Sequence, residues 1–176
     1  QVLNVNLSYM QTSFELLQGK CNDDFAYRIE RKRLMDSLAA LSSALVRMLD
    51  EPASKQRAVE DINLFIVQNY LLVAHVAALR SILGRHASQL PVAPVNALLT
   101  HSHTQVCKTL SRALDQLDNK ASISAPQPAL PAPAVADVGW SGWPLVQRRI
   151  RLLQADADKI VVHSAAIVHI VTPRSS

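Results

Sequence analysis

Apolar residues along most of this chain recur at steps of three and four, the spacing that places side chains on one face of an α-helix. The pattern predicts helices over residues 2–18, 24–50, 54–86 and 95–118. The third segment carries two neighbouring apolar stripes, one through Ile66 and Val73 and one through Phe65 and Leu72. A face that wide indicates contact with more than one partner helix.

Glycine, acidic and proline residues mark where these helices begin and end. Gly19 can end the first helix, and the acidic residues up to Asp24 can cap the second. Pro52 stops the second helix, because the residue before a proline is pushed out of the α region. Pro91 and Pro94 mark the break before the fourth helix.

Residues 121–138 differ from the rest, because they combine four prolines with alanines and small polar residues. Such a composition predicts an extended, exposed linker. Pro144 then suits an early position of a last helix, which ends at Thr172 before Pro173. The apolar stripe of that helix, from Val146 to Val171, predicts that it docks back onto the others.

The predicted fold class is all-α, an antiparallel up-and-down bundle of four main helices with a short N-terminal lead-in helix. Residues 1–176 form one domain: helices over 1–120, a Pro-rich linker over 121–138, and the last helix within 139–176. Six residues on the apolar faces are expected to be buried, namely Leu41, Leu45, Ile66, Val73, Leu110 and Ile160.

Composition agrees with helices, since the chain is 49% hydrophobic but only 5% aromatic and has 4 glycines. Cys21 and Cys107 are too few for a disulfide framework, and a reducing compartment fits them better. The chain begins with Gln1, so we expect a piece of a longer protein. Its longest apolar runs, 71–79 and 160–171, fall short of the roughly 20 residues of a membrane-spanning helix, so we expect this piece to be soluble.

No residue set predicts a catalytic, cofactor or metal site. His103 and Cys107 share a helix face, but His101 does not, and a third ligand would have to be His163 or His169 from another helix. The pairs Asp156 with Asp158 and Glu60 with Asp61 point to different sides of their helices, and Ser42-Ser43 has no nearby base. We therefore predict ordinary histidines and no enzyme.

A basic cluster of Arg28, Arg31, Lys32 and Arg33 lies on the second helix. It can simply cover a solvated helix face, with Glu30 offering weak local pairing. It can instead face anionic lipid headgroups, at about 1 kcal/mol per well-placed residue. Nucleic-acid binding is disfavoured, because the modest net charge of +4 is not concentrated into a stripe and the segment lacks stacking groups.

Trp140 and Trp143 flank a Ser-Gly pair beside the linker. Two indoles can form a partner-binding hot spot or an anchor at a membrane interface. We favour a third interpretation from their position at a junction, which is that they clamp the last helix onto the bundle.

The segments AYR at 26–28, RKR at 31–33, LAALSSAL at 38–45 and MLDEP at 48–52 resemble the soluble C-terminal region of the FUSC family. These are bacterial inner-membrane proteins of the YccS-like, fusaric-acid-resistance type. The resemblance covers residues 16–80, and its markers include no catalytic signature. Near Met35-Asp36 the family pattern has polar residues of the His-Asn type, so no role of theirs carries over.

The resemblance implies a cytoplasmic regulatory, assembly or scaffold domain of a transporter-like efflux protein, some of whose relatives are regarded as exporters of aromatic carboxylic acids. Its partners would be the membrane-spanning part of the same polypeptide, anionic headgroups and further subunits, with no nucleic acid. The alternative is a free-standing interaction module that forms a homodimer through the wide face of the third helix.

Overall fold

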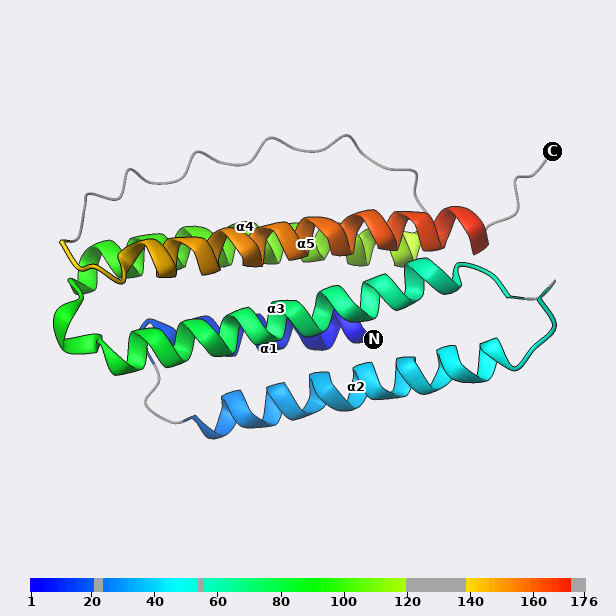
Figure 1. Cartoon of the computed structure of the whole chain (residues 1–176), viewed down its shortest axis with the longest axis horizontal. Helices are drawn as coiled ribbons and strands as arrows, with labels where there is room; N and C mark the ends of the chain where they lie inside the picture. Colours follow the sequence, from blue (N-terminus) through cyan, green and yellow to red (C-terminus); the bar gives the residue numbers. More distant parts are fainter. Residues whose placement is uncertain (21–23, 54–55, 120–138, 172–176) are drawn as a thin grey trace.

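The computed structural model describes residues 1–20, 24–53, 56–119 and 139–171. Helices occupy nearly all of these ranges, which contain no strand, so the all-α class is confirmed. The elements, in chain order, are α1 (Val2–Leu17), α2 (Phe25–Leu49), α3 (Val59–Arg85), the 3₁₀ turn η1 (Ala87–Gln89), α4 (Val92–Asn119) and α5 (Trp143–Val171). They pack side by side as an elongated helical bundle (Figure 1).

The first helix ends where its glycine predicts. Gly19 has φ of +67°, a conformation that a residue without a Cβ adopts at little cost. The Lys20 N–H then donates to the Glu15 carbonyl at 3.0 Å, which closes the last turn. The second helix likewise ends at Leu49, shortly before Pro52.

Two helix starts differ from the prediction. The third helix begins at Val59 rather than at Ser54, because Ala58 adopts a left-handed conformation with φ of 52° and interrupts the helix there. The fourth begins at Val92, three residues before the predicted Val95. Pro94 therefore lies in the first turn, where its missing N–H has no helical partner to lose.

Chain direction alternates from α1 to α4, but α5 runs parallel to α4 (Figure 1). Both helices start beside His86, whose ring lies 4.7 Å from that of Trp140, and Leu117 and Ile167 near their ends line one cavity. The predicted up-and-down order therefore does not extend to the last helix. The predicted linker at 121–138 lies outside the described residues.

Five of the six residues expected in the core are buried: Leu45, Ile66, Val73, Leu110 and Ile160. The prediction is wrong for Leu41, which is half-buried and lines a cavity instead. Helix α3 packs against α1, α2 and α5, which confirms that its apolar surface meets several partners.

Candidate functional site

Most of the basic cluster is paired with carboxylates on its own helix. Arg28 lies 3.1 Å from Asp24, and Lys32 and Arg33 pair with Asp36 and Glu30, one turn away in each case. The side chains of Arg28, Lys32 and Arg33 are between 66% and 76% exposed, so each pair contributes only a few tenths of a kcal/mol. The structure thus places the cluster on a solvated helix face.

Asp24 joins this cluster to α3. It occupies the N-cap position of α2, but its side chain makes no capping hydrogen bond. Instead, its carboxylate accepts a hydrogen bond of 2.8 Å from Arg80, and the Arg80 guanidinium lies 4.7 Å from the centre of the Tyr27 ring. A cation over an aromatic face adds attraction at this contact.

Charge is separated along the bundle. We call the end where α1 and α3 finish and α2, α4 and α5 begin the basic end (Figure 1). The described side chains that reach solvent in this half are Lys20, Arg28, Arg31, Lys32, Arg33, Arg80, Arg85, Arg148, Arg149 and Arg151 against Glu15, Asp24, Glu30 and Asp36. In the other half they are Asp50, Glu51, Glu60, Asp61, Asp115, Asp118 and Asp158 against Arg47, Arg57, Lys108, Arg112 and Lys159.

The tryptophans also lie at the basic end, where they attach the start of α5. Trp143 is 3% exposed within the core, and the half-buried Trp140 packs against the core and against the His86 ring. Trp140 also covers Gly142, where a Cβ would overlap its indole. These contacts agree with the interpretation that the two tryptophans clamp the last helix onto the bundle.

Large apolar side chains remain exposed at the basic end. Phe25, Val92 and Leu145 are 57%, 72% and 44% exposed. They come from the starts of α2, α4 and α5, which are distant in sequence. The basic end thus combines excess positive charge with apolar groups in water.

The outer face of α3 is a second exposed apolar surface. Val67, Tyr70 and Leu71 are 41%, 40% and 40% exposed, and Ala74 is exposed beside them. By its spacing Tyr70 belongs to the apolar stripe of Ile66 and Val73, but unlike those two residues it is exposed. We call these four residues the outer stripe.

Polar residues link α3 to α5 within the apolar interface. Arg149 Nη1 donates to His75 Nδ1 at 3.1 Å, and His75 Nε2 lies 3.4 Å from Asp156 Oδ2. Burial lowers the pKa of His75 and raises the pKa of Asp156, which is 3% exposed. Nearer the other end, His163 Nδ1 lies 3.0 Å from Asp61 Oδ1. These groups are placed to align the two helices.

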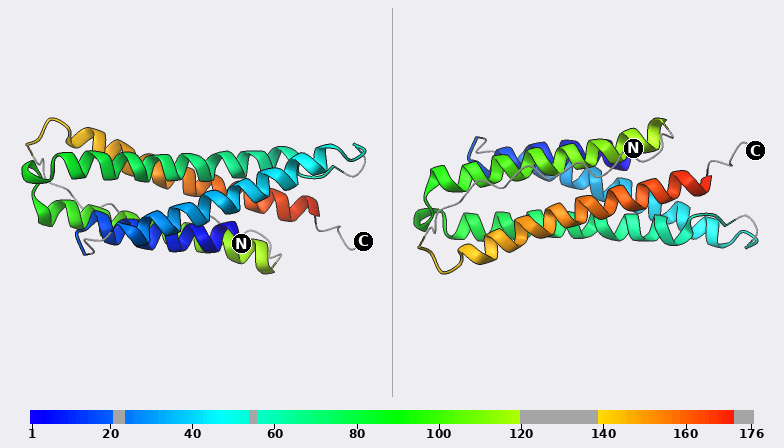
Figure 2. Two further views of the ribbon diagram at one scale, coloured as in Figure 1. Left: turned by 90° about the horizontal axis from the view of Figure 1, so that it is seen from below. Right: turned by 90° about the horizontal axis from the view of Figure 1, so that it is seen from above.

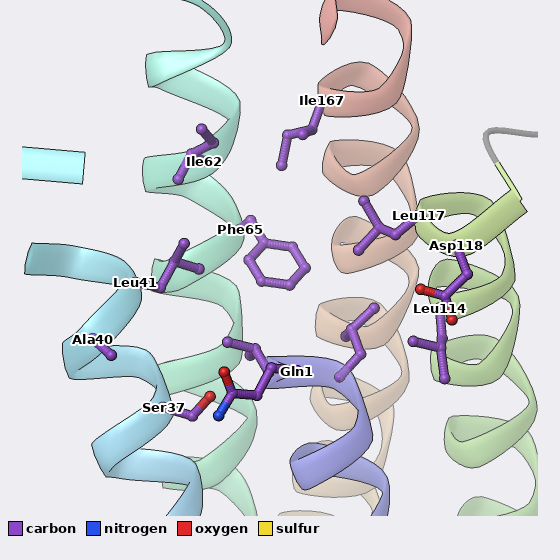
Figure 3. Close-up of a pocket in the computed structure, with 12 residues that line it drawn as sticks. Gln1, Ser37, Ala40, Leu41, Ile62, Phe65, Leu114, Leu117, Asp118 and Ile167 are labelled. Atoms are coloured by element: carbon purple, nitrogen blue, oxygen red, sulfur yellow. The ribbon is translucent and has the colours of Figure 1, made fainter. Parts of the chain in front are cut away.

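A cavity of about 450 Å³ opens between all five helices beside the first turn of α1 (Figure 3). Its walls are mostly apolar, and the Ser37 hydroxyl and Asp118 carboxylate contribute polar groups. The lining residues are Gln1, Val2, Leu3, Ser37, Ala40, Leu41, Ile62, Phe65, Leu114, Leu117, Asp118 and Ile167. The cavity can exclude water from an apolar group, but its lining holds no pair of nucleophile and base.

His103, His163 and Cys107, three of the candidate metal ligands, are held by other contacts. The His103 ring stacks on Phe14 with centroids 5.0 Å apart, and burial lowers its pKa. Burial raises the pKa of the Cys107 thiol to about 11, so it stays protonated and behaves as an apolar side chain. His163 is engaged by Asp61. Within the described ranges, no three His, Cys, Asp or Glu side chains come together as metal ligands would.

No family model, curated protein or solved structure matches this chain. One described helix, α3, is long and apolar enough to cross a membrane by length and composition, with a mean hydropathy of 1.7 over its most apolar 18 residues. Buried contacts within the bundle take up 44% of that window. The apolar run at 71–79 is thus part of a longer apolar helix.

The sequence analysis missed two features. One is the set of polar contacts between α3 and α5, and the other is the outer stripe. A signal for the first was visible, because His75 and His163 interrupt the two longest apolar runs. The signal for the outer stripe was that apolar residues occur at nearly every angle around the axis of α3. A helix buried on one side has no structural need for Val67 and Leu71 on the other.

Proposed function

We propose that this chain is a cytoplasmic regulatory, assembly or scaffold domain of an inner-membrane protein similar to the FUSC family, an efflux transporter by that resemblance. In this proposal the basic end faces the anionic headgroups of the cytoplasmic leaflet. The observation that carries it is the excess of Lys and Arg at one end of the bundle beside exposed apolar side chains.

Charge is the first support for this orientation. An anionic bilayer attracts basic residues near its surface by about 1 kcal/mol each, and the attraction fades over roughly 10 Å at 0.1 M salt. The basic end presents Arg31 and Arg148 as exposed cations besides the members that are locally paired. The local ion pairs do not remove the attraction to the bilayer, because Lys and Arg outnumber the carboxylates in that half of the bundle.

The exposed side chains of Phe25, Val92 and Leu145 are the second support. Apolar groups beside cations are typical of surfaces that lie in the boundary between headgroups and acyl chains. The segments that resemble the family include α2 and most of α3, which contribute the basic cluster and Arg80. The resemblance and the charge separation therefore concern the same part of the bundle.

Vesicle co-sedimentation tests the orientation. The protein should bind vesicles that contain an anionic phospholipid, bind purely zwitterionic vesicles weakly, and dissociate as salt rises. Changing Arg28, Arg31, Lys32 and Arg33 together to Gln should abolish most of the binding. The matched control changes Arg47, Arg57, Arg112 and Lys159 to Gln, which removes the same charge from the other half and should leave binding nearly intact.

Equal losses in the two variants would show attraction by net charge alone and reject the orientation. Fractionation of the full-length protein tests the membrane assignment separately. Recovery with the inner membrane is expected, and recovery in the soluble fraction would overturn the assignment. A homodimeric interaction module is the second candidate, which the outer stripe of α3 favours.

A further inference from the structure

The outer stripe runs along the side of α3 that its neighbours leave open. Its positions, 67, 70, 71 and 74, follow the spacing of one helix face, and α3 forms most of one long edge of the molecule in Figure 2, with only the start of α5 (gold) lying outside it. The opposite side of α3 carries the buried Leu72, Val76 and Leu79. The stripe is therefore an unpartnered apolar helix face.

We propose that this face binds a second copy of the chain, with the two α3 helices antiparallel about a two-fold axis between Tyr70 and Leu71. In that register Val67 lies opposite Ala74 of the partner subunit, and Tyr70 lies opposite the partner's Leu71. Val67 then meets a small side chain, and Tyr70 forms an aromatic–aliphatic pair with the partner's Leu71 on each side of the axis. A two-fold interface must pair a surface with itself, and this stripe maps onto itself.

Charge at the two ends of α3 selects this direction. Glu60 lies in the first turn and Arg85 in the last. Arg85 reaches back along the helix, because its Nη2 donates to Ser81 Oγ at 2.7 Å and its Nε to the Ser81 carbonyl at 3.1 Å. The register places Ser81 opposite Glu60 of the partner subunit, so the Arg85 guanidinium meets that carboxylate.

A parallel arrangement would bring like charges together at both ends of the seam. The antiparallel seam forms two Glu60–Arg85 pairs, one at each end, which are related by the two-fold axis. It spans the 26 residues from Glu60 to Arg85, which are 25 steps of 1.5 Å or about 38 Å. A single helix pair of this length buries less surface than an obligate dimer, so the association is reversible and depends on concentration.

The dimer does not rest on the proposed membrane role, because the outer stripe and the basic cluster lie on different helices. Sedimentation equilibrium of the protein over a range of concentrations should show a monomer–dimer equilibrium. Leu71→Lys places two charges at the centre of the seam and should leave only monomer. Circular dichroism should show an unchanged helix content, since Leu71 is not part of the core.

Charge reversal gives the sharpest test. Glu60→Arg and Arg85→Glu, each alone, turn both end pairs into repulsions and should weaken the dimer roughly tenfold. The double variant should recover dimerisation. A mixture of the two single variants should also recover it, because a heterodimer has opposite charges at both ends.

Lys32→Glu, an exposed charge reversal on α2, is the matched control and should leave the equilibrium unchanged. The inference is overturned if the protein is monomeric at all concentrations. It is equally overturned if Leu71→Lys leaves a dimer intact, or if the mixture of single variants associates no better than each variant alone.

Discussion

The hydrogen bond between Asn6 and Asn69 should contribute a measurable coupling free energy to folding. Asn6 Nδ2 donates to Asn69 Oδ1 at 2.6 Å, and both residues are 0% exposed. Asn69 Nδ2 in turn donates to the Phe65 carbonyl at 2.8 Å. Helices α1 and α3 are thus joined by an amide pair that water does not reach.

The two single substitutions should differ in their effect. Asn69→Ala leaves the Asn6 amide buried without an acceptor, which costs about 1–3 kcal/mol beyond the lost packing. Asn6→Ala should cost less, because it also removes Asn6 Oδ1, a buried oxygen that has no partner among the described residues. The double variant should lose about 1 kcal/mol less than the sum of the two single losses.

Urea unfolding followed by circular dichroism would measure these free energies. The control cycle combines Asn69→Ala with Gly84→Ala, because Gly84 lies 15 residues further along α3, about 22 Å away, and has open space where a Cβ would be added. In that control pair, the losses in the free energy of unfolding should add to within about 0.5 kcal/mol. Additivity in the Asn6 cycle as well would refute the coupling through this hydrogen bond.

Three further predictions concern the core, the response to pH and the tryptophan clamp. Leu38→Asp buries a carboxylate at a 0% exposed site and should unfold the protein, whereas Leu41→Asp at the cavity wall should only lower the melting temperature; equal effects would contradict this difference in burial. Since burial lowers the pKa of His75 below 6.5, the unfolded state binds a proton that the native state does not, so stability should fall as pH drops below about 6.5. His75→Gln should make urea unfolding less dependent on pH in that range, and an unchanged slope would exclude His75 as the cause. Gly142→Ala should displace the Trp140 indole and change tryptophan fluorescence, while an unchanged spectrum would argue against the packing over Gly142.

Local signals predicted the helices well, because each depends on neighbours in the chain. Gly19, Pro52 and the three-and-four spacing act within one or two turns, so the sequence contains the whole cause. The late start of α3 depends on the backbone of Ala58, and nothing in the side chain of an alanine indicates a left-handed conformation. The predicted helix boundaries were wrong where the type of residue did not cause the boundary.

The candidate surfaces were only partly predictable, because they depend on which helices meet. The basic cluster was visible as a run in sequence, but the basic end was not, since Arg80 and Arg148 join it only through the bundle. The outer stripe was hidden for the opposite reason. Periodicity shows that Tyr70 lies on an apolar face but does not show which apolar face of α3 its neighbours cover.

Chain reach alone does not set the direction of α5. Returning along α4 requires about 42 Å at 1.5 Å per residue, and the 19 residues between Asn119 and Gly139 can span about 60 Å when extended. Either direction is therefore open to the chain, and the apolar stripe of α5 could be buried in both.

Polar contacts choose between the two directions. Turned end for end about its midpoint at residue 157, α5 would move Arg149 by 16 residues, about 24 Å along the helix axis, and so away from His75. His163 would also leave Asp61. Because both contacts form together only when α5 runs antiparallel to α3, they favour the observed direction over one in which apolar burial would be similar. Apolar residues drive the docking of α5, and these few polar ones determine its orientation.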